Sequence, residues 1–149
     1  KSLKKAFDIL KEKYDSLIFE TFIPGKEIQV ALLGDKAIGA IELRPKREFY
    51  DYAAKYKKSS KTLHVMPAEI PKKKYKEVLK ISEKANKVLK CRGVVRCDFR
   101  FNQNKFFLLE ANTQPGMTSL SLVPEIAQYS NFSFIKLVKW MVNDASLNR

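Results

Sequence analysis

VVRCDFRFNQNKFFLLEAN, residues 94–112, is the stretch that decides the fold of this chain. Two mainly apolar runs flank a polar segment near 103–104, and polar side chains recur at every second position in parts of both runs. This alternation is typical of strands that bury one face. The stretch therefore predicts two antiparallel strands joined by a short polar loop.

Four polar side chains of this hairpin are candidates for one site. Arg96 and Asp98 share a face of the first strand, and Glu110 and Asn112 share a face of the second. All four meet if Asp98 lies opposite Glu110, which requires a loop of three or five residues or a β-bulge. Two carboxylates and an amide oxygen about 5 Å apart suit Mg²⁺ with substrate phosphate. The alternative is an ion pair between Arg96 and the carboxylates, and spacing alone leaves both open.

The rest of the pattern predicts an α+β domain with antiparallel sheets. We expect a second hairpin with its turn at Gly34-Asp35 and a functional or mobile loop over 44–63. Other expected elements are a helix over 2–13, an apolar strand over 16–23, a helix over 71–90 with Pro71 in its first position, and a last helix after an N-cap at Ser133. Expected core residues are Val95, Cys97, Phe99, Leu109 and Ala111 in the first hairpin, with Phe134, Leu137, Val138, Trp140 and Met141 in the last helix; His64 is expected to be structural.

Composition narrows the class of protein. A hydrophobic share of 45% over 149 residues is that of one globular domain, and its apolar runs are shorter than the roughly 18 residues of a membrane span. Two cysteines without metal-ligand spacing indicate reduced thiols in a cytoplasmic protein. The net charge is +13, and lysines crowd the stretch 72–90. This positive charge fits a solvated helix face, the steering of a polyphosphate substrate or nucleic-acid binding.

Five blocks of the chain stand out in order: FIPGKEIQVALLGD (22–35), FYDYAAKY (49–56), TLHVMPAEI (62–70), CRGVVRCDF (91–99) and EANTQPGMTSLSLVP (110–124). Together, and in the same order, they resemble blocks of the D-alanine:D-alanine ligases of the ATP-grasp superfamily. The resemblance implies an ATP-grasp C-terminal catalytic lobe over 25–149, preceded over 1–24 by the last helix and strand of the small lobe. The family's phosphate loop and N-terminal domain are not among these blocks, and the chain opens without Met. We therefore expect a fragment of the ligase that is inactive alone.

The resemblance also implies roles for individual residues. Asp98, Glu110 and Asn112 match ligands of two Mg²⁺ ions, or of Mn²⁺ in their place. Arg96 and the backbone N–H of Gly116 match the groups that stabilise an oxyanion. Residues that match the second D-alanine site are Ser121 and Leu122, although Leu120 stands where many members have His. Residues that match the ATP site are Glu20, Ile23, Glu27, Phe49, Lys55, Tyr56 and Leu109.

The implied activity is ATP-dependent joining of two D-alanines through an acyl phosphate, for peptidoglycan synthesis. The implied enzyme is cytoplasmic and homodimeric, acts on D-alanine and ATP, and needs neither nucleic acid nor a membrane. One alternative is an ATP-grasp ligase with another acceptor, such as D-lactate or D-serine. The other is a basic nucleic-acid-binding module.

Overall fold

The computed structural model describes residues 3–45 and 62–146 and has the expected α+β architecture. One antiparallel sheet runs in the order β3-β2-β1-β4-β5. The strands are β1 (Lys26–Leu33), β2 (Lys36–Arg44), β3 (Leu63–Val65), β4 (Val94–Asn102) and β5 (Lys105–Asn112). The helices are α1 (Leu3–Lys11), α3 (Lys72–Val88), α4 (Leu122–Tyr129) and α5 (Phe134–Asp144).

Both predicted hairpins are confirmed. β1 and β2 meet at the Gly34-Asp35 turn, where Gly34 has a φ of 55° that glycine adopts without strain. β4 and β5 are joined by Gln103 and Asn104, both at positive φ (46° and 62°), as a two-residue hairpin turn with matching twist requires. β1 pairs with both β2 and β4, so the two hairpins form one sheet.

A β-bulge sets the register of the second hairpin. The pairing runs regularly from the turn to Phe99 and Leu108, and then shifts so that Asp98 lies opposite Glu110. Leu109 is the extra residue of the shift. This corrects the expectation that Leu109 belongs to the core: its side chain is 56% exposed, because the bulge removes it from the alternation of β5.

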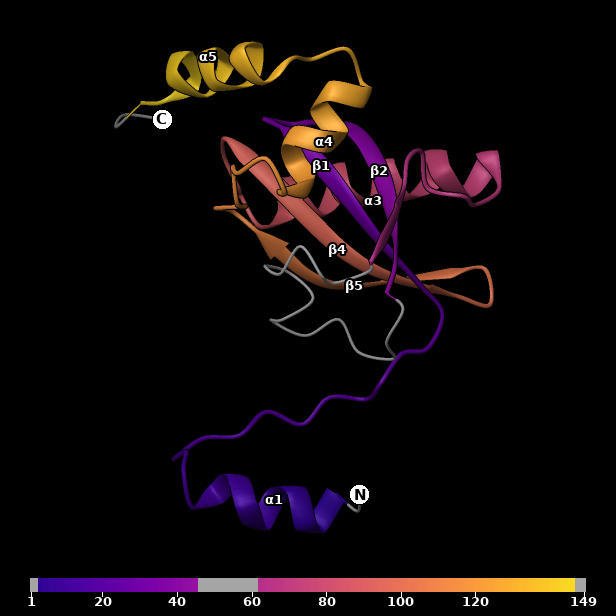
Figure 1. The fold of residues 1–149 in the computed structure, drawn as a ribbon, viewed down its shortest axis with the longest axis vertical. Coiled ribbons are helices and arrows are strands. Elements are labelled where there is room, and N and C mark those ends of the chain that lie inside the picture. Colours follow the sequence, from indigo (N-terminus) through magenta and orange to yellow (C-terminus); the bar gives the residue numbers. More distant parts are fainter. Residues whose placement is uncertain (1–2, 46–61, 147–149) are drawn as a thin grey trace.

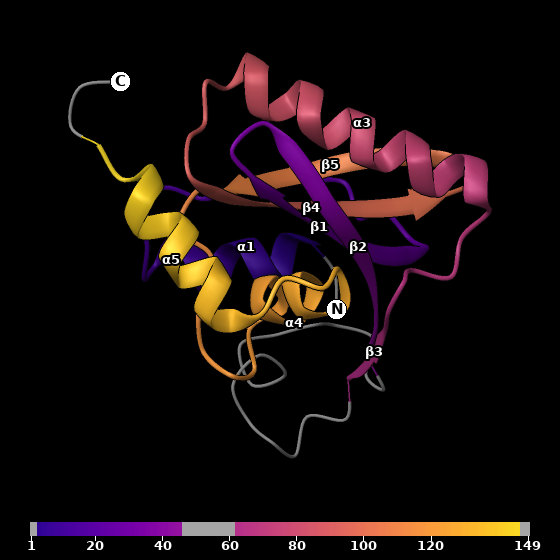
Figure 2. The same cartoon turned by 90° about the horizontal axis from the view of Figure 1, so that it is seen from above.

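The sheet is covered differently on its two faces. α3 packs across one face, over a core that includes Ile28, Val30, Cys97 and Phe99. α4 and part of α5 pack on the other face, as Figure 2 shows. This second core does not cover the whole of its face. Toward one end of β1, β4 and β5 the face carries polar residues instead: Glu27, Gln29, Asp98, Arg100 and Glu110.

The approach of α4 to the sheet depends on Gly39 of β2. A Cβ at this position would lie 2.9 Å from Ile126 of α4 and 3.0 Å from Met66. The Ser130 hydroxyl, just after α4, donates a 2.6 Å hydrogen bond to the carbonyl of Ile38. The absent side chain therefore lets α4 lie close to β2.

Buried charge on the α3 face is fully partnered. Glu42 lies opposite Ile28 and accepts hydrogen bonds from Lys26 at 3.0 Å, from Arg44 at 2.7 Å and from the backbone of Glu69 at 3.1 Å. Burial alone would raise the pKa of Glu42, but the hydrogen bonds from Arg44 and Lys26 outweigh burial and lower it. This carboxylate is thus held in its charged form.

The N-terminal segment departs from the expectation. α1 confirms the predicted helix, but 16–23 forms no strand, since no described segment pairs with it. Its apolar side chains, Ile18, Phe19 and Phe22, are exposed, and Phe19 contacts Phe7 of α1 with ring centroids 5.8 Å apart. Figure 1 shows α1 apart from the sheet at the end of this extended segment. The proposed boundary between lobes at residue 24 stays a prediction.

The remaining expectations are met in part. Pro71 directly precedes α3 instead of occupying its first position. The Ser133 cap of α5 is confirmed, because its hydroxyl accepts from the amide of Lys136. Phe134 and Val138 were wrongly placed in the core and are exposed, since only the Leu137 side of α5 meets the sheet.

Most of the predicted loop 44–63 lies outside the described residues. No helix in the described part of the chain has the length and apolar character to cross a membrane.

Candidate functional site

The four polar side chains singled out in the sequence come together on one sheet face. Asp98 lies opposite Glu110, and Arg96 lies opposite Asn112, as the magnesium interpretation required. The bulge, not a longer loop, provides this register. Gln29 of β1 lies opposite Asp98 on the other side, so an amide and two carboxylates follow one another across β1, β4 and β5.

Arg96 and Asp98 form a buried bidentate ion pair. Nε of Arg96 lies 2.7 Å from Oδ1 of Asp98, and Nη2 lies 2.8 Å from Oδ2. The two residues are 7% and 8% exposed, and Arg96 Nη2 also reaches Glu110 at 3.5 Å. The ion-pair alternative is therefore present in the structure. A cation at Asp98 would have to take over the role that Arg96 has here.

The carboxylates of the site have the chemistry of a hard-cation site. Burial raises the pKa of Asp98, and the nearby charge of Glu110 adds to the rise, while the hydrogen bonds from Arg96 oppose it. The described residues contain no cluster of three His, Cys, Asp or Glu side chains suited to a metal. Two carboxylates with the Asn112 amide fit Mg²⁺ nevertheless, since this ion usually binds one or two carboxylates and completes its shell with water and phosphate.

The loop after β5 brings Gly116 and Ser121 together. A Cβ on Gly116 would lie 2.9 Å from the Ser121 hydroxyl, so only glycine fits without a shift of the neighbouring side chain. Ser121 is the N-cap residue of α4, yet its hydroxyl turns toward the loop and accepts from the amide of Thr118 at 2.9 Å. Asn112 fixes the start of the loop, because its Oδ1 accepts from the amide of Gln114 at 2.9 Å.

A second polar group lies two residues further along β1 and β4, on the same face. Glu27 is opposite Arg100, and Nη1 of Arg100 lies 3.4 Å from its carboxylate. Nε of Arg100 donates to the carbonyl of Ile23 at 2.8 Å. On the other side of Glu27, Nε2 of Gln29 donates to its Oε1 at 3.3 Å. This group connects the segment before β1 with the candidate metal site.

Other residues implied by the resemblance are more scattered. Glu20 is exposed on the segment between α1 and β1. The side chain of Leu122 is buried in the second core, so only its backbone at the start of α4 is available to a ligand. Leu109 is exposed beside the site. Three further residues, Phe49, Lys55 and Tyr56, lie outside the described residues.

Gln29 and Arg100 also belong to this face but were not predicted from the sequence. Both could have been found by strand alternation, since Gln29 is two residues from Glu27 and Arg100 is two residues from Asp98. The side chain of Gln29 is only 1% exposed, and its Oε1 is buried without a hydrogen-bond partner. Its Nε2 must be the atom facing Glu27, because a carboxylate only accepts, so the orphan atom is an acceptor.

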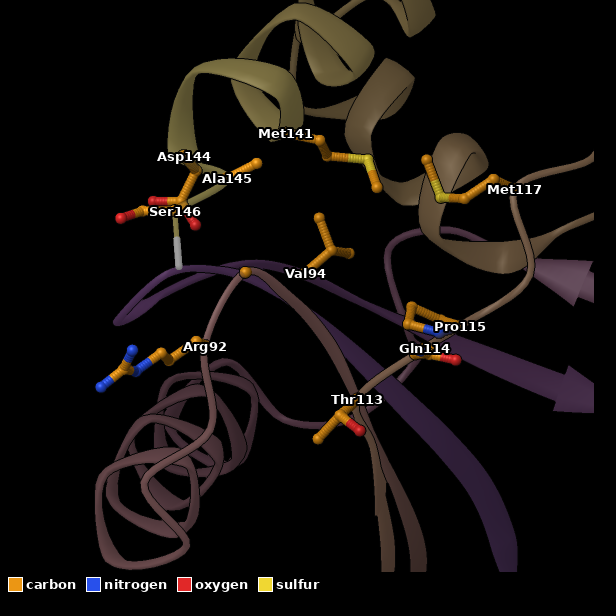
Figure 3. A pocket seen from close by; sticks show the side chains of 11 residues that line it. Arg92, Val94, Thr113, Gln114, Pro115, Met117, Met141, Asp144, Ala145 and Ser146 are labelled. Atoms are coloured by element: carbon orange, nitrogen blue, oxygen red, sulfur yellow. The ribbon is translucent and has the colours of Figure 1, made fainter. Parts of the chain in front are cut away.

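A cavity of about 380 Å³ borders the loop that follows β5. Figure 3 shows Met117 and Met141 on its side toward the helices, with Arg92 and Thr113 at the opposite side. The single histidine lies elsewhere: Nδ1 of His64 in β3 is 2.7 Å from the carboxylate of Glu125 in α4. This contact agrees with the structural role expected for His64.

Comparison with known proteins gives a consistent result. Residues 1–143 match the family model described as D-ala D-ala ligase C-terminus. The D-alanine–D-alanine ligase of Pelagibacter ubique is 51% identical over 148 residues, which are 99% of this chain and 48% of that protein. The ligase of Paramagnetospirillum magneticum is 44% identical over 88% of the chain and 45% of its own length. The chain thus spans about half the length of these curated relatives.

Solved structures agree with the sequence relatives. The D-alanine–D-alanine ligase of Bacillus anthracis complexed with ATP superposes with a TM-score of 0.79 at 29% identity, over 96% of this chain and 48% of that one. The D-Ala:D-Ser ligase VanG of Enterococcus faecalis superposes with a TM-score of 0.68 at 28% identity, over 82% of this chain and 36% of that one. The ATP-grasp fold expected from the resemblance is confirmed.

Proposed function

The chain belongs to the D-ala D-ala ligase C-terminus family, and from this premise we propose that it is the ATP-grasp half of an enzyme that joins two D-alanines with ATP. One observation carries the proposal. The bulge at Leu109 places Asp98 opposite Glu110 and Arg96 opposite Asn112, so three hard oxygen ligands and one cation share a sheet face. The product would serve peptidoglycan synthesis.

Asp98, Glu110 and Asn112 would hold two Mg²⁺ ions. When bound, these ions would neutralise charge on the phosphate oxygens of ATP. Because Asp98 is buried and its pKa is raised, its charged form gains more from a bound cation than an exposed carboxylate would. The chain's own contribution is to hold these oxygens on strands whose register is fixed.

The reaction has two steps. The carboxylate of the first D-alanine attacks the γ-phosphorus of ATP, and ADP leaves, which gives an acyl phosphate. The amine of the second D-alanine then attacks the acyl carbon, loses a proton and expels phosphate. In this step negative charge develops on the carbonyl oxygen. Arg96, released from Asp98, and the N–H of Gly116 would donate to this oxygen, and Ser121 with the Leu122 N–H would hold the acceptor carboxylate at the start of α4.

The nucleoside would bind at the other end of the same face. Glu27 would take the ribose hydroxyls, while Glu20 and Ile23 would contact the adenine, with Leu109 and Phe49 against its ring. Lys55 and Tyr56 would close over the γ-phosphate. We further propose a cytoplasmic homodimer that needs neither nucleic acid nor a membrane. Six lysines of α3 lie on its exposed side, on the sheet face opposite the site, and so take no part in the proposed ligand site: Lys72, Lys73, Lys76, Lys80, Lys84 and Lys87.

Titration of the ¹⁵N-labelled chain with ATP and MgCl₂ tests the proposal. We expect amide shifts at 23–29, 96–100 and 110–116, and their loss in Glu110→Gln.

A completed ligase, in which the N-terminal half of the Pelagibacter ubique relative precedes this chain, should release phosphate only with D-alanine present. Shifts confined to the α3 lysines, or phosphate release that ignores D-alanine, would contradict the proposed function. D-Serine and D-lactate in place of the second D-alanine test the acceptor.

A further inference from the structure

We propose that Arg100 is a positioning residue that fixes the nucleoside end of the site by holding the segment before β1 and the carboxylate of Glu27 at the same time. The inference rests on the proposed function, which places a nucleotide on this face. It adds a residue that the motif resemblance does not include.

The guanidinium of Arg100 bonds to two separate parts of the chain. Nε of Arg100 donates to the Ile23 carbonyl at 2.8 Å, and Nη1 reaches the Glu27 carboxylate at 3.4 Å. The guanidinium also lies 5.7 Å from the ring centroid of Phe22. A planar group with donors at fixed angles sets the relative position of its two acceptors, which a single ammonium cannot do.

The same segment also approaches β4 closely at Gly25. Gly25 has a φ of 111°, and a Cβ there would lie 2.3 Å from the carbonyl oxygen of Phe101. The chain is therefore held against β4 at two neighbouring points, by Arg100 at Ile23 and by backbone contact at Gly25. Beyond this anchor the segment is exposed, as Phe22 and Phe19 show.

Glu27 is held from two sides. Its two oxygens are approached by different donors: Oε1 by Gln29 at 3.3 Å and Oε2 by Arg100 at 3.4 Å. Arg100 and Glu27 are directly opposed on β4 and β1, with side chains only 18% and 15% exposed. Arg100 therefore orients a carboxylate and a carbonyl toward the same ligand without facing the reacting atoms.

The experiment compares Arg100→Ala, Arg100→Lys and the matched control Arg92→Ala in the full chain. Amide exchange of 22–27 and binding of two probes, ATP and inorganic triphosphate, are followed by NMR with MgCl₂ present. We expect exchange of 22–27 to rise about tenfold in Arg100→Ala. We also expect ATP to bind about tenfold more weakly, with triphosphate binding within twofold of the unaltered chain. In Arg100→Lys, ATP should still bind at least about threefold more weakly than in the unaltered chain. Arg92→Ala should change neither the amide exchange nor the binding of ATP.

Three results would overturn the inference: unchanged exchange at 22–27 in Arg100→Ala, equal weakening of ATP and triphosphate, or full recovery by lysine. Equal weakening would show a general structural defect, and full recovery would show that charge alone matters. If the unaltered chain binds neither probe, the proposed function fails instead. The exchange of 22–27 then decides whether Arg100 fixes this segment.

Discussion

The pKa values of the buried carboxylates shift in opposite directions on the two faces of the sheet. On the α3 face, Glu42 is buried with three hydrogen-bond donors, and its pKa is lowered. On the site face, Gln29 buries an acceptor without a partner, and the pKa of Asp98 is raised although Arg96 holds it with two bonds. The same strands supply both faces. The carboxylate buried on the α3 face is partnered within the fold, although Oδ1 of Asn86 in α3 is also buried without a hydrogen-bond partner, and the site face has groups that a bound ligand would complete.

The largest effect on stability is expected on the α3 face. Phe99 is fully buried and contacts Phe106 edge-on, with ring centroids 6.1 Å apart. Phe99→Ala should lower the free energy of unfolding by about 3–5 kcal/mol, because the cavity cannot be refilled between sheet and helix. Urea denaturation measures this loss. A loss under about 1 kcal/mol would show that the α3 face is not the main core.

The site face should show its effect in turnover. In the completed ligase, Arg96→Ala should reduce kcat by about a hundredfold to a thousandfold, with a smaller change in the KM for ATP, because the charge it meets develops during the reaction. Asp98→Asn and Glu110→Gln should also raise the KM for Mg²⁺·ATP. Steady-state kinetics and thermal melts of the same variants separate the roles. A melt several degrees lower with near-normal kcat would mean that Arg96 is only the ion-pair partner of Asp98.

The partnered carboxylate of the α3 face should make stability depend on pH. Glu42→Gln should lower the free energy of unfolding by about 1–3 kcal/mol at pH 7, since it removes hydrogen bonds to a charged group. The pKa of Glu42 is lowered in the fold, so its contribution is present above the ordinary value of 4.5 and is lost as pH falls through the folded pKa. Urea melts at pH 7 and pH 3 measure this. A difference between the two proteins that persists undiminished at pH 3 would contradict it.

The smallest expected effect has the opposite sign. Gln29→Met keeps the shape of the side chain and removes the orphan acceptor, although it also removes the 3.3 Å bond to Glu27. We expect a gain in unfolding free energy of about 1 kcal/mol, together with weaker binding of ATP. Gln29→Glu serves as the control, because it adds a charge to the same buried position. A destabilised Gln29→Met would show that Gln29 is already satisfied in the fold.

Strand alternation made much of the site predictable. Arg96, Asp98, Glu110 and Asn112 could be placed on one face because residue type and spacing agreed, and the bulge was one of the solutions that this placement allowed. The identity of the bulged residue could not be foreseen, so Leu109 was assigned to the core. The strand predicted over 16–23 was wrong for another reason. Its composition favours a strand, but a strand needs a partner, and local sequence does not supply one.

The close packing at Gly39 has a consequence for how acceptor preference could change. Gly39 belongs to β2, which carries none of the proposed catalytic or metal-binding residues, yet its missing side chain determines how near α4 lies to the sheet. Ser121, the N-cap residue of α4, is proposed to hold the acceptor carboxylate, so the place of its hydroxyl depends partly on a strand that carries no proposed catalytic or metal-binding residue. Selection for enzymes that accept bulkier D-amino acids should therefore include Gly39→Ala beside the residues that contact the substrate.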